Sequence, residues 1–560
     1  MALPKHDYET DVLVVGAGPV GLFVAWRLSQ LGQPCMMIEK SLTTTVHPKM
    51  EYTNSRTAEI YSLTGLDHVL KPLAIPEKYT FNETWTTGFG GELLTTWERP
   101  SPEENRKQAL SENDGTWSCE PRIRQMQSIF EAELKKWALK DRLVTDIWGY
   151  ELIATEETEH GVLSTARNMS GHEITIKSRF MVGPLYMQYA HFKTPDIAKF
   201  RSHGQFWHAF FCTGSAVAQD EINTYTVHRN VAEPAPMTNP EEWVAETLGG
   251  MTGKPFPVKI DKMITHGTWK TSISVADQFR SAKGRVFICG DAAHPLSPAG
   301  GFGFNSGIQD GFDLTWKLHA YLQGYGGDKL LESFSTERRK AVILQHDMSE
   351  VLLNEVIIPI FAMAGKIGAQ SVTAMGKEGD ANRAELKALI ERGYVLHDLE
   401  GIVLDYRYPS SGINIPDPEG SEPAWDRTKV HPSTWPGARA PHVFLSDKKT
   451  SIFHLYGRGF TLVDFTESGD AADIFADVAR SMAVPLKKVH LPKERHCRKI
   501  WERDAVLVRP DGFVSWRCHL ENPSVTAEQA KKVLKQALGQ DWKDELEHMI
   551  PPEIKQCSNL

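Results

Sequence analysis

Three glycines and a glutamate near the N-terminus have the residue types and spacing of a dinucleotide-binding turn. They are Gly16, Gly18, Gly21 and Glu39. Gly16 permits the tight turn, Gly18 lets a pyrophosphate approach the backbone, and Gly21 lets a helix pack closely on a sheet. That helix offers free N–H groups to phosphates, and a carboxylate about twenty residues later can accept hydrogen bonds from a ribose diol. The acid favours an unphosphorylated ribose, as in FAD or NAD; the alternative is a glycine-rich turn without a ligand.

A second glycine-rich segment lies between residues 290 and 305. Gly290 and Asp291 could place a carboxylate near a ribityl chain, and the loop PAGGFGFN could direct backbone N–H groups at a flavin ring and its phosphates. The loop residues that we assign to the cofactor are Gly300, Gly301, Gly303 and Asn305. A surface loop before an amphipathic helix is the alternative, but it leaves these glycines unexplained, since each costs chain entropy on folding.

Both segments require strands and helices to position them. The β-branched run Val12–Val15 predicts a buried parallel strand, Val20–Leu31 a helix, and Cys35–Ile38 a second strand that ends at the acid. Val286–Cys289 predicts another short buried strand, and a helix is expected from about Gly307. We therefore expect both glycine segments at the carboxyl ends of strands in one sheet.

At this point the sequence resembles the single-component FAD-dependent aromatic hydroxylases, in the phenol hydroxylase branch. The segment GDAAHPLSPAGGFGFNSGIQDGFDLTWKL is similar to their flavin-loop motif, and NSRTAEI and RQMQSIFE to two further segments. LLESFSTERR is similar to the helix that closes the flavin domain. PGARAPHVFL, LYGRGFTLVDF and VLVRPDGFVSWR are similar to the C-terminal domain of this branch.

The resemblance implies a chemistry and several site residues. The cofactor is FAD, the transient reductant is NADPH or NADH, and the reactants are O2 and a phenolic or aromatic polyketide-type small molecule. Arg56 and Gln127 are implied to lie near FAD, and Glu51 to act on the substrate as the catalytic acid or base. For Glu51 the alternative is a surface carboxylate. His47 and His294 are alternative bases, and Trp207 is either a pocket residue or a core aromatic.

Two features depart from the family pattern. An Asp-Gly motif usually follows a strand of the flavin domain, whereas here Gly183 runs directly into Pro184. Lys49 and Asp313 stand where Arg and Asn are commoner, which are milder changes. The missing Asp-Gly leaves an alternative function open, in which the chain is a flavin-fold accessory protein or inactive homologue that does not complete the oxidative cycle.

The expected fold is an α/β FAD-binding domain of Rossmann-like, glutathione-reductase type, with an inserted β-rich substrate domain and a C-terminal thioredoxin-like domain. The last assignment comes from the resemblance; a domain without CxxC cannot run dithiol chemistry. We expect the following ranges: 1–75, 120–183 and 268–341 for the FAD domain, 76–119 and 184–267 for the substrate domain, 342–407 for a helical segment, 408–441 for a linker and 442–550 for the C-terminal domain.

Bulk composition excludes several classes of function. A net charge of -9 and the absence of a dominant basic cluster argue against nucleic acid as a partner. The seven cysteines contain no CxxC pair, so neither a zinc knuckle nor a thioredoxin redox pair is expected, and no metal site is assigned. Leu352–Ala364 is apolar but short, which predicts a buried helix and no membrane contact. We expect a cytoplasmic protein, and a homodimer is compatible with the resemblance.

Overall fold

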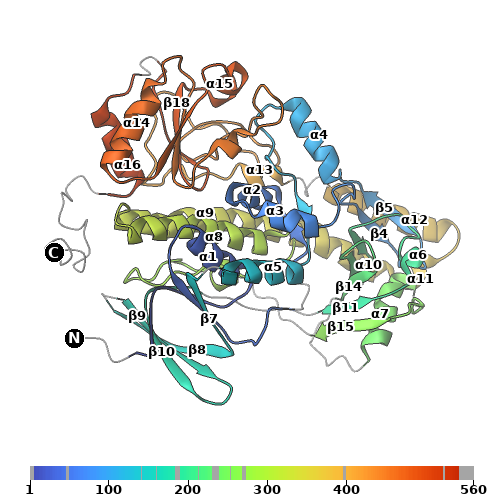
Figure 1. Cartoon of the computed structure of the whole chain (residues 1–560). Helices are drawn as coiled ribbons and strands as arrows, with labels where there is room; N and C mark the ends of the chain where they lie inside the picture. The colour runs from blue at the N-terminus through green and yellow to red at the C-terminus, as the bar shows by residue number, and fades with distance from the viewer. Residues whose placement is uncertain are drawn as a thin grey trace.

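The computed structural model describes residues 6–45, 50–140, 142–158, 161–182, 189–211, 214–229, 239–252, 254–267, 273–394, 399–520 and 524–540. Three sheets organise these residues, and the long helices α8 (Phe302–Leu322) and α9 (Asp328–Val351) run between the first sheet and the C-terminal domain (Figure 1). His47, Lys49 and the Gly183–Pro184 junction lie outside the described residues.

The first sheet carries the glycine turn. Its strand order is β7-β2-β1-β10-β9-β8, in which β1 is parallel to β2 and β10, and β8 and β9 are antiparallel additions. The strands are β7 (Val144–Trp148), β2 (Cys35–Glu39), β1 (Tyr8–Val15), β10 (Glu173–Val182), β9 (Gly161–Asn168) and β8 (Tyr150–Thr158). Helices α1 (Pro19–Gln30) and α5 (Gln127–Lys140) pack together beside it. Apolar residues of β1, such as Val12 and Val14, and of α1 form one buried core with α8.

The second sheet lies at the N-terminal end of α8, where Trp85 and Phe302 share a core. Its order is β15-β11-β14-β13-β12-β4-β5, and β12 pairs parallel with β4. The strands are β15 (Lys262–Gly267), β11 (Tyr189–Lys193), β14 (Thr224–Arg229), β13 (Gly214–Ala218), β12 (His208–Phe210), β4 (Glu83–Thr86) and β5 (Leu93–Trp97). Helix α7 (Pro240–Gly249) contacts β13 and β14, and one face of the sheet holds a phenylalanine-rich core. The other face is therefore the one available to a site.

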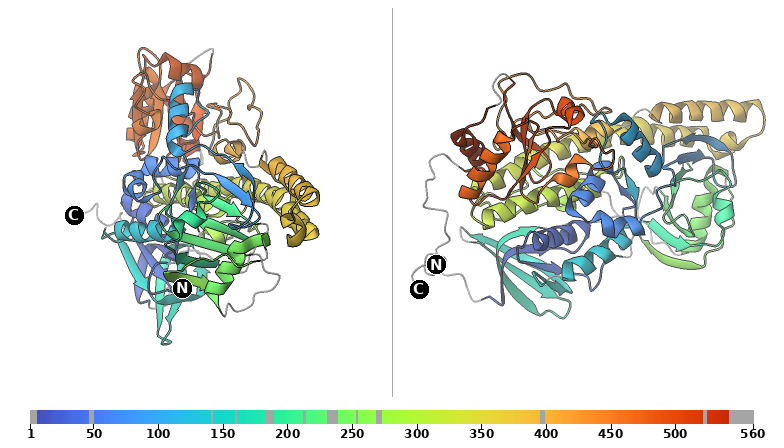
Figure 2. Two further views of the ribbon diagram at one scale, coloured as in Figure 1. Left: turned by 90° about the vertical axis from the view of Figure 1, so that its right-hand side faces the viewer. Right: turned by 45° about the horizontal axis from the view of Figure 1, so that its top comes forward.

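The C-terminal sheet has the order β17-β16-β18-β19, with β16 and β17 parallel and the other pairs antiparallel. The strands are β16 (Phe460–Asp464), β17 (Leu486–His490), β18 (Ala505–Val508) and β19 (Val514–Arg517), and the helices are α14 (Asp470–Ser481), α15 (Arg495–Trp501) and α16 (Ala527–Ala537). Both views in Figure 2 show this domain stacked on the long helices. Segment 408–441 has no helix or strand. Its residue Ala440 belongs to the core of this domain, so the end of the segment packs against the domain.

The remaining elements connect these layers. A small sheet pairs β3 (Tyr52–Thr53) with β6 (Ile123–Arg124). The connecting helices are α2 (Ser55–Thr64), α3 (Asp67–Leu70), α4 (Pro102–Glu112), α6 (Ile197–Phe200), α10 (Ile358–Ile367), α11 (Ala369–Thr373), α12 (Lys377–Tyr394) and α13 (Glu400–Leu404). Short single turns are η1 (Lys71–Leu73), η2 (Gly250–Thr252), η3 (Gly290–Ala292), η4 (Leu352–Ile357) and η6 (Ile452–Leu455).

Two expectations for single elements were wrong. Residues Val286 and Phe287 form only isolated bridges instead of a strand, and α8 begins at Phe302 rather than near Gly307. Gly303 and Asn305 therefore lie in the first turn of a helix, not in a loop. The apolar segment from Leu352 continues α9 through one wide turn, and only its stripe Leu352, Val356, Ile360 and Ala364 is buried.

One helical stretch of the described chain, Asp328–Ile367, has the length and mean hydropathy that a membrane span needs. Core helices of soluble proteins pass the same criterion, so this feature is weak evidence for a membrane.

Candidate functional site

The glycine turn after β1 leaves space where a phosphate group can approach. Gly16 has a φ of 95°, in the left-handed region. A Cβ built on Gly18 would meet nothing within 4 Å, whereas a Cβ on Gly21 would come within 1.9 Å of the Gly16 carbonyl oxygen. Gly21 is thus required for helix packing, and the space beside Gly18 stays open. Helix α1 begins here without a side-chain cap, so its first N–H groups remain available to an anion.

Glu39 lies at the end of β2, beside the turn. Its carboxylate accepts hydrogen bonds from the backbone N–H groups of Ala17, at 2.7 Å, and Ser41, at 2.8 Å. The side chain is half-buried. The structure therefore brings the three glycines and this acid together, and the acid also fixes the conformation of the turn.

Gly290 is held by a buried charge network that the sequence analysis did not identify. Asp310 accepts hydrogen bonds from the Gly290 N–H at 3.0 Å, from His294 Nε2 at 2.5 Å and from Arg338 Nε at 2.8 Å. Arg338 also donates to the Tyr408 hydroxyl. Burial alone would raise the pKa of Asp310, but His294 and Arg338 lower it to about 2. His294 is thus engaged in this network, and Asp291 is left exposed at the end of the motif.

The following loop closes onto the β3 segment through Asn305. Gly300 and Gly301 have φ values of 84° and 65°, which an L side chain rarely adopts. The Asn305 side chain accepts from the Asn54 N–H at 2.9 Å and donates to the Tyr52 and Gly301 carbonyls at 3.2 and 2.7 Å. Asn305 therefore holds the loop in place, whereas Gly303 has open space where a side chain would be.

Gln127 and Arg56 occupy different surroundings. Gln127, at the start of α5, donates to Glu131, which in turn accepts from the Thr45 N–H. Arg56 is buried and pairs with Glu59, donates to the Asp511 carbonyl at 2.6 Å, and lies over the Phe513 ring.

Arg439 adds a second guanidinium to Glu59, at 2.9 Å, so Arg56 belongs to an ionic junction between α2 and the C-terminal domain. Burial alone would raise the pKa of Glu59, but Arg439 and Arg56 lower it to about 2. Among the described residues, the hydrogen bonds of the Arg56 guanidinium go to Glu59 and Asp511, and not to the glycine segments.

Glu51 pairs with a residue of the second sheet. Its Oε1 lies 3.1 Å from His208 Nε2, and each side chain is 20% exposed. His228 lies on the same sheet face as His208. Ser215 pairs with both Phe210 and His228, and Phe210 shares a face with His208 because the two are two residues apart on β12. Burial lowers the pKa of His228 to about 4, so this imidazole is neutral at pH 7. The pair could accept or relay a proton, and sequence analysis had no signal for His208.

Aromatic rings surround this pair. Trp207 lies 5.3 Å from Tyr52 and 5.4 Å from Phe81, centroid to centroid. On the same sheet Trp85 stacks on Phe210 at 4.5 Å. Trp85 shares a core with Phe302 at the start of α8 and with Ala299 in the loop that precedes α8, which we call the flavin-type loop. This sheet face and the flavin-type loop therefore meet. The arrangement places aromatic rings close to a carboxylate–imidazole pair.

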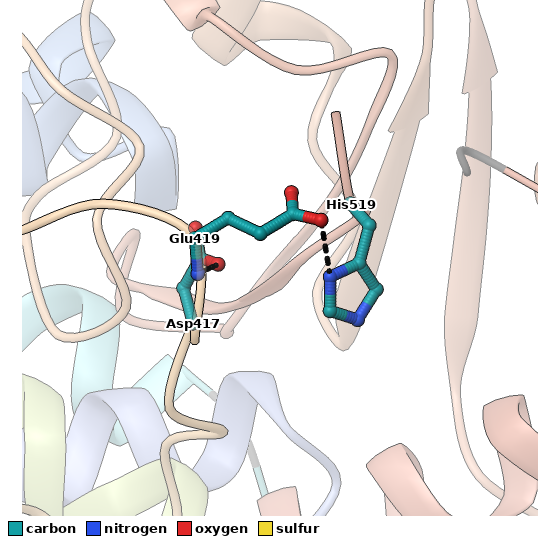
Figure 3. Close-up of side chains that lie close together, drawn as sticks. All are labelled: Asp417, Glu419 and His519. Atoms are coloured by element: carbon teal, nitrogen blue, oxygen red, sulfur yellow. Dashed lines mark hydrogen bonds and ion pairs between the residues drawn. The ribbon is translucent and has the colours of Figure 1, made fainter. Parts of the chain in front are cut away.

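Two carboxylate clusters outside this region are already neutralised by cations. Asp417, Glu419 and His519 lie together, with Glu419 directed at the imidazole at 3.1 Å (Figure 3). Asp417 binds Arg503 and Arg517 at 3.1 and 2.6 Å. The buried cluster Asp313, Glu337 and Asp511 is likewise bound by Lys317 and Arg509. A metal ion would have to displace these cations.

Comparison with known proteins assigns the chain to a family. A family model described as an FAD binding domain matches residues 9–184 and 186–347, and one described as the C-terminal domain of aromatic-ring hydroxylases matches residues 433–541. The FAD-dependent monooxygenase apdD of Emericella nidulans is 36% identical over 95% of this chain and 90% of its own length. The 2,4-dichlorophenol 6-monooxygenase of Cupriavidus pinatubonensis is 27% identical over 91% of this chain and 93% of its own. The structure of the flavin-dependent monooxygenase PieE with FAD and substrate shares the fold, with a TM-score of 0.80, 23% identity and coverage of 96% and 100%.

Proposed function

The chain belongs to the family of FAD-dependent aromatic-ring hydroxylases, and from this premise we propose that it hydroxylates a phenolic or aromatic polyketide-type small molecule with NAD(P)H and O2. It is an FAD-dependent monooxygenase. The observation that carries the substrate proposal is the Glu51–His208 pair among aromatic rings, where the second sheet meets the flavin-type loop.

We propose that FAD binds at the two glycine segments, because the groups around them suit its parts. The open space at Gly18 and the uncapped start of α1 suit the pyrophosphate, and Glu39 suits the ribose. We propose that the ribityl chain lies at Asp291 and the ring at the segment from Gly300 to Asn305, where the loop enters α8. Gln127 stays in the proposed set, whereas the contacts of Arg56 support a structural role at the C-terminal junction. When bound, FAD supplies the activation of O2 and the transfer of one oxygen atom.

The residues of this chain would prepare the ring for attack. A phenol has a pKa of about 10, so a base must remove or share its proton at neutral pH. Glu51 can accept that proton directly or through His208, since the two are within hydrogen-bond distance. The rings of Trp207, Tyr52 and Phe81 would exclude water and orient the substrate.

Replacing Glu51 with Gln, or His208 with Gln, tests this assignment. Each change should lower the hydroxylation rate by about 10²–10³-fold, because a positioned base contributes on that order. NAD(P)H-dependent flavin reduction should stay near the wild-type rate, and product should be scored by mass as one added oxygen. His266→Gln, at an exposed residue of edge strand β15, is the matched control. Unchanged hydroxylation with a neutral phenol in both variants would exclude the pair from the chemistry.

We propose a thioredoxin-like C-terminal domain without dithiol function, a cytoplasmic location and a homodimer. The first rests on the order β17-β16-β18-β19 with helices between the strands. We keep as proposals the domain limits expected from the sequence, 1–75, 120–183 and 268–341 for the FAD domain and 442–550 for the C-terminal domain. Cys557 lies outside the described residues, whereas Cys497 and Cys518 are both buried.

Removing the two buried C-terminal thiols should leave turnover intact. Burial raises the pKa of Cys497 and of Cys518, so neither is a thiolate at neutral pH. The double variant Cys497→Ala/Cys518→Ala should hydroxylate at the wild-type rate, measured as product formed per bound FAD. A lost rate in a protein that melts at the wild-type temperature would contradict a non-redox role.

A further inference from the structure

A cavity of about 500 Å³ lies where the FAD domain meets the C-terminal domain. Helices α1, α2, α3 and α8 supply one wall, and the segment around Phe453–Gly457 supplies the other. Phe312, in the middle of α8, lines this cavity. It comes ten residues after Phe302, a separation of about 15 Å along the helix axis. A molecule against Phe312 would therefore lie well along α8 from the end of the flavin-type loop.

The wall of this cavity contains a buried arginine without a carboxylate partner. Arg27 is 4% exposed, and its Nε has no hydrogen-bond partner among the described residues. Its Nη1 donates to Gln30, and the guanidinium lies 5.5 Å from the Phe312 ring centroid. In the part of the chain that the structure describes, Arg27 forms no ion pair, and the charged group that lowers its pKa is another cation, Arg458. Burial lowers the pKa of Arg27 to about 9, which leaves it charged at neutral pH.

Buried charges in proteins are ordinarily paired, because leaving one unpaired costs several kcal/mol. The unpaired Arg27 beside a cavity therefore indicates an absent anion. A planar guanidinium matches a carboxylate in size and geometry, through two parallel hydrogen bonds.

Other lining groups define the rest of the ligand. Asp67 is 7% exposed, and its Oδ2 lies 3.8 Å from Lys71. Within the part of the chain that the structure describes, neither Asp67 Oδ1 nor the Tyr456 hydroxyl has a hydrogen-bond partner. Phe312 and Phe453 supply apolar rings. We propose that this cavity is a second small-molecule site, which binds an aromatic carboxylic acid with its carboxylate on Arg27 and its ring against the phenylalanines, and which favours acids that carry a hydroxyl for Asp67.

Calorimetric titration of the FAD-loaded full chain with benzoate and 4-hydroxybenzoate tests the site. Both acids should bind, and Arg27→Met should weaken them at least about tenfold, the worth of a charge-assisted hydrogen bond. Asp67→Asn should weaken 4-hydroxybenzoate more than benzoate. Arg480→Met, at an exposed pair on α14, is the control and should bind as wild type does. Benzoate should also raise the melting temperature of wild type and not that of Arg27→Met.

The methionine variant should fold, because it keeps an apolar stem against Phe312 and removes a charge that has no partner to lose. Four results would overturn the proposal. The first is equal affinity of wild type and Arg27→Met for benzoate. The second is loss of binding in Glu51→Gln, which would place the acid in the substrate site. The third is binding of inorganic phosphate as tightly as benzoate, which would indicate an anion site without aromatic preference. An absence of binding of either acid up to ~10 mM, an affinity weaker than about 3 kcal/mol, would also overturn it.

Discussion

A protein with valine in place of Gly18 is expected to fold normally and to purify without FAD. The backbone at Gly18 has φ -71° and ψ -178°, which any L residue adopts, and a Cβ there would meet nothing within 4 Å. The fold therefore accommodates the side chain. It would occupy the space through which the pyrophosphate approaches the first turn of α1, so we expect FAD affinity to fall by more than about 100-fold, as a lost set of phosphate hydrogen bonds implies.

The flavin absorbance of the purified protein and its melting temperature separate these effects. Gly21→Ala is the matched comparison, because its Cβ would lie 1.9 Å from the Gly16 carbonyl oxygen and must push α1 away from the turn. Gly18→Val should lose colour while retaining the melting temperature of the apoprotein, and Gly21→Ala should lose both. A yellow Gly18→Val protein with one FAD per chain would show that the pyrophosphate does not bind at this turn.

The contrast between these two glycines shows what the sequence could predict. The turn, the helix after it and the acid at the end of β2 lie within 24 residues, so each motif residue is positioned by its own neighbours. The helix expected at Val20–Leu31 is α1 (Pro19–Gln30), and the strand expected at Cys35–Ile38 is β2 (Cys35–Glu39), each within one residue. The family assignment is also correct, since two family models match most of the chain.

Interactions between distant segments were beyond such reasoning. His208 reaches Glu51 across 157 positions, and Arg439 reaches Glu59 across 380. Periodicity carries no information about such pairs, because a polar residue on a strand has the same pattern whether it faces solvent or a partner. The expected strand at Val286 failed for a related reason. A β-branched run predicts a buried extended segment, but a strand also needs a neighbour with free backbone groups along its whole length.

Asp310 is the position where a single-atom change should most reduce stability. Asp310→Asn keeps the shape of the side chain but removes the charge that lies between Arg338 and His294, all of them fully buried. Removing one partner of a buried ion pair costs about 3–5 kcal/mol, because the remaining charge stays desolvated. The Gly290 N–H loses its carboxylate acceptor as well, so the Gly290-Asp291 turn should loosen and FAD should bind more weakly.

The pH dependence of unfolding gives a second measurement. The folded pKa of Asp310, about 2, lies below its ordinary value of 3.8. Its contribution to stability is therefore complete above pH 3.8 and is lost as the pH falls towards 2. Urea unfolding at several pH values should show a steeper loss of stability in this window for wild type than for Asp310→Asn. Asp477→Asn, in an exposed pair with Arg480, is the control and should change stability by less than about 0.5 kcal/mol.

The same variant distinguishes two roles of the network. If Asp310 only stabilises the core, added FAD should restore the melting temperature of Asp310→Asn by as much as it raises that of wild type. If the carboxylate also holds the Gly290 turn, the stabilisation by FAD should be smaller in the variant, because binding must first restore the turn. We expect the second result, since the Gly290 N–H and the His294 ring share one carboxylate oxygen. The turn and the charge network are thus coupled at a single atom.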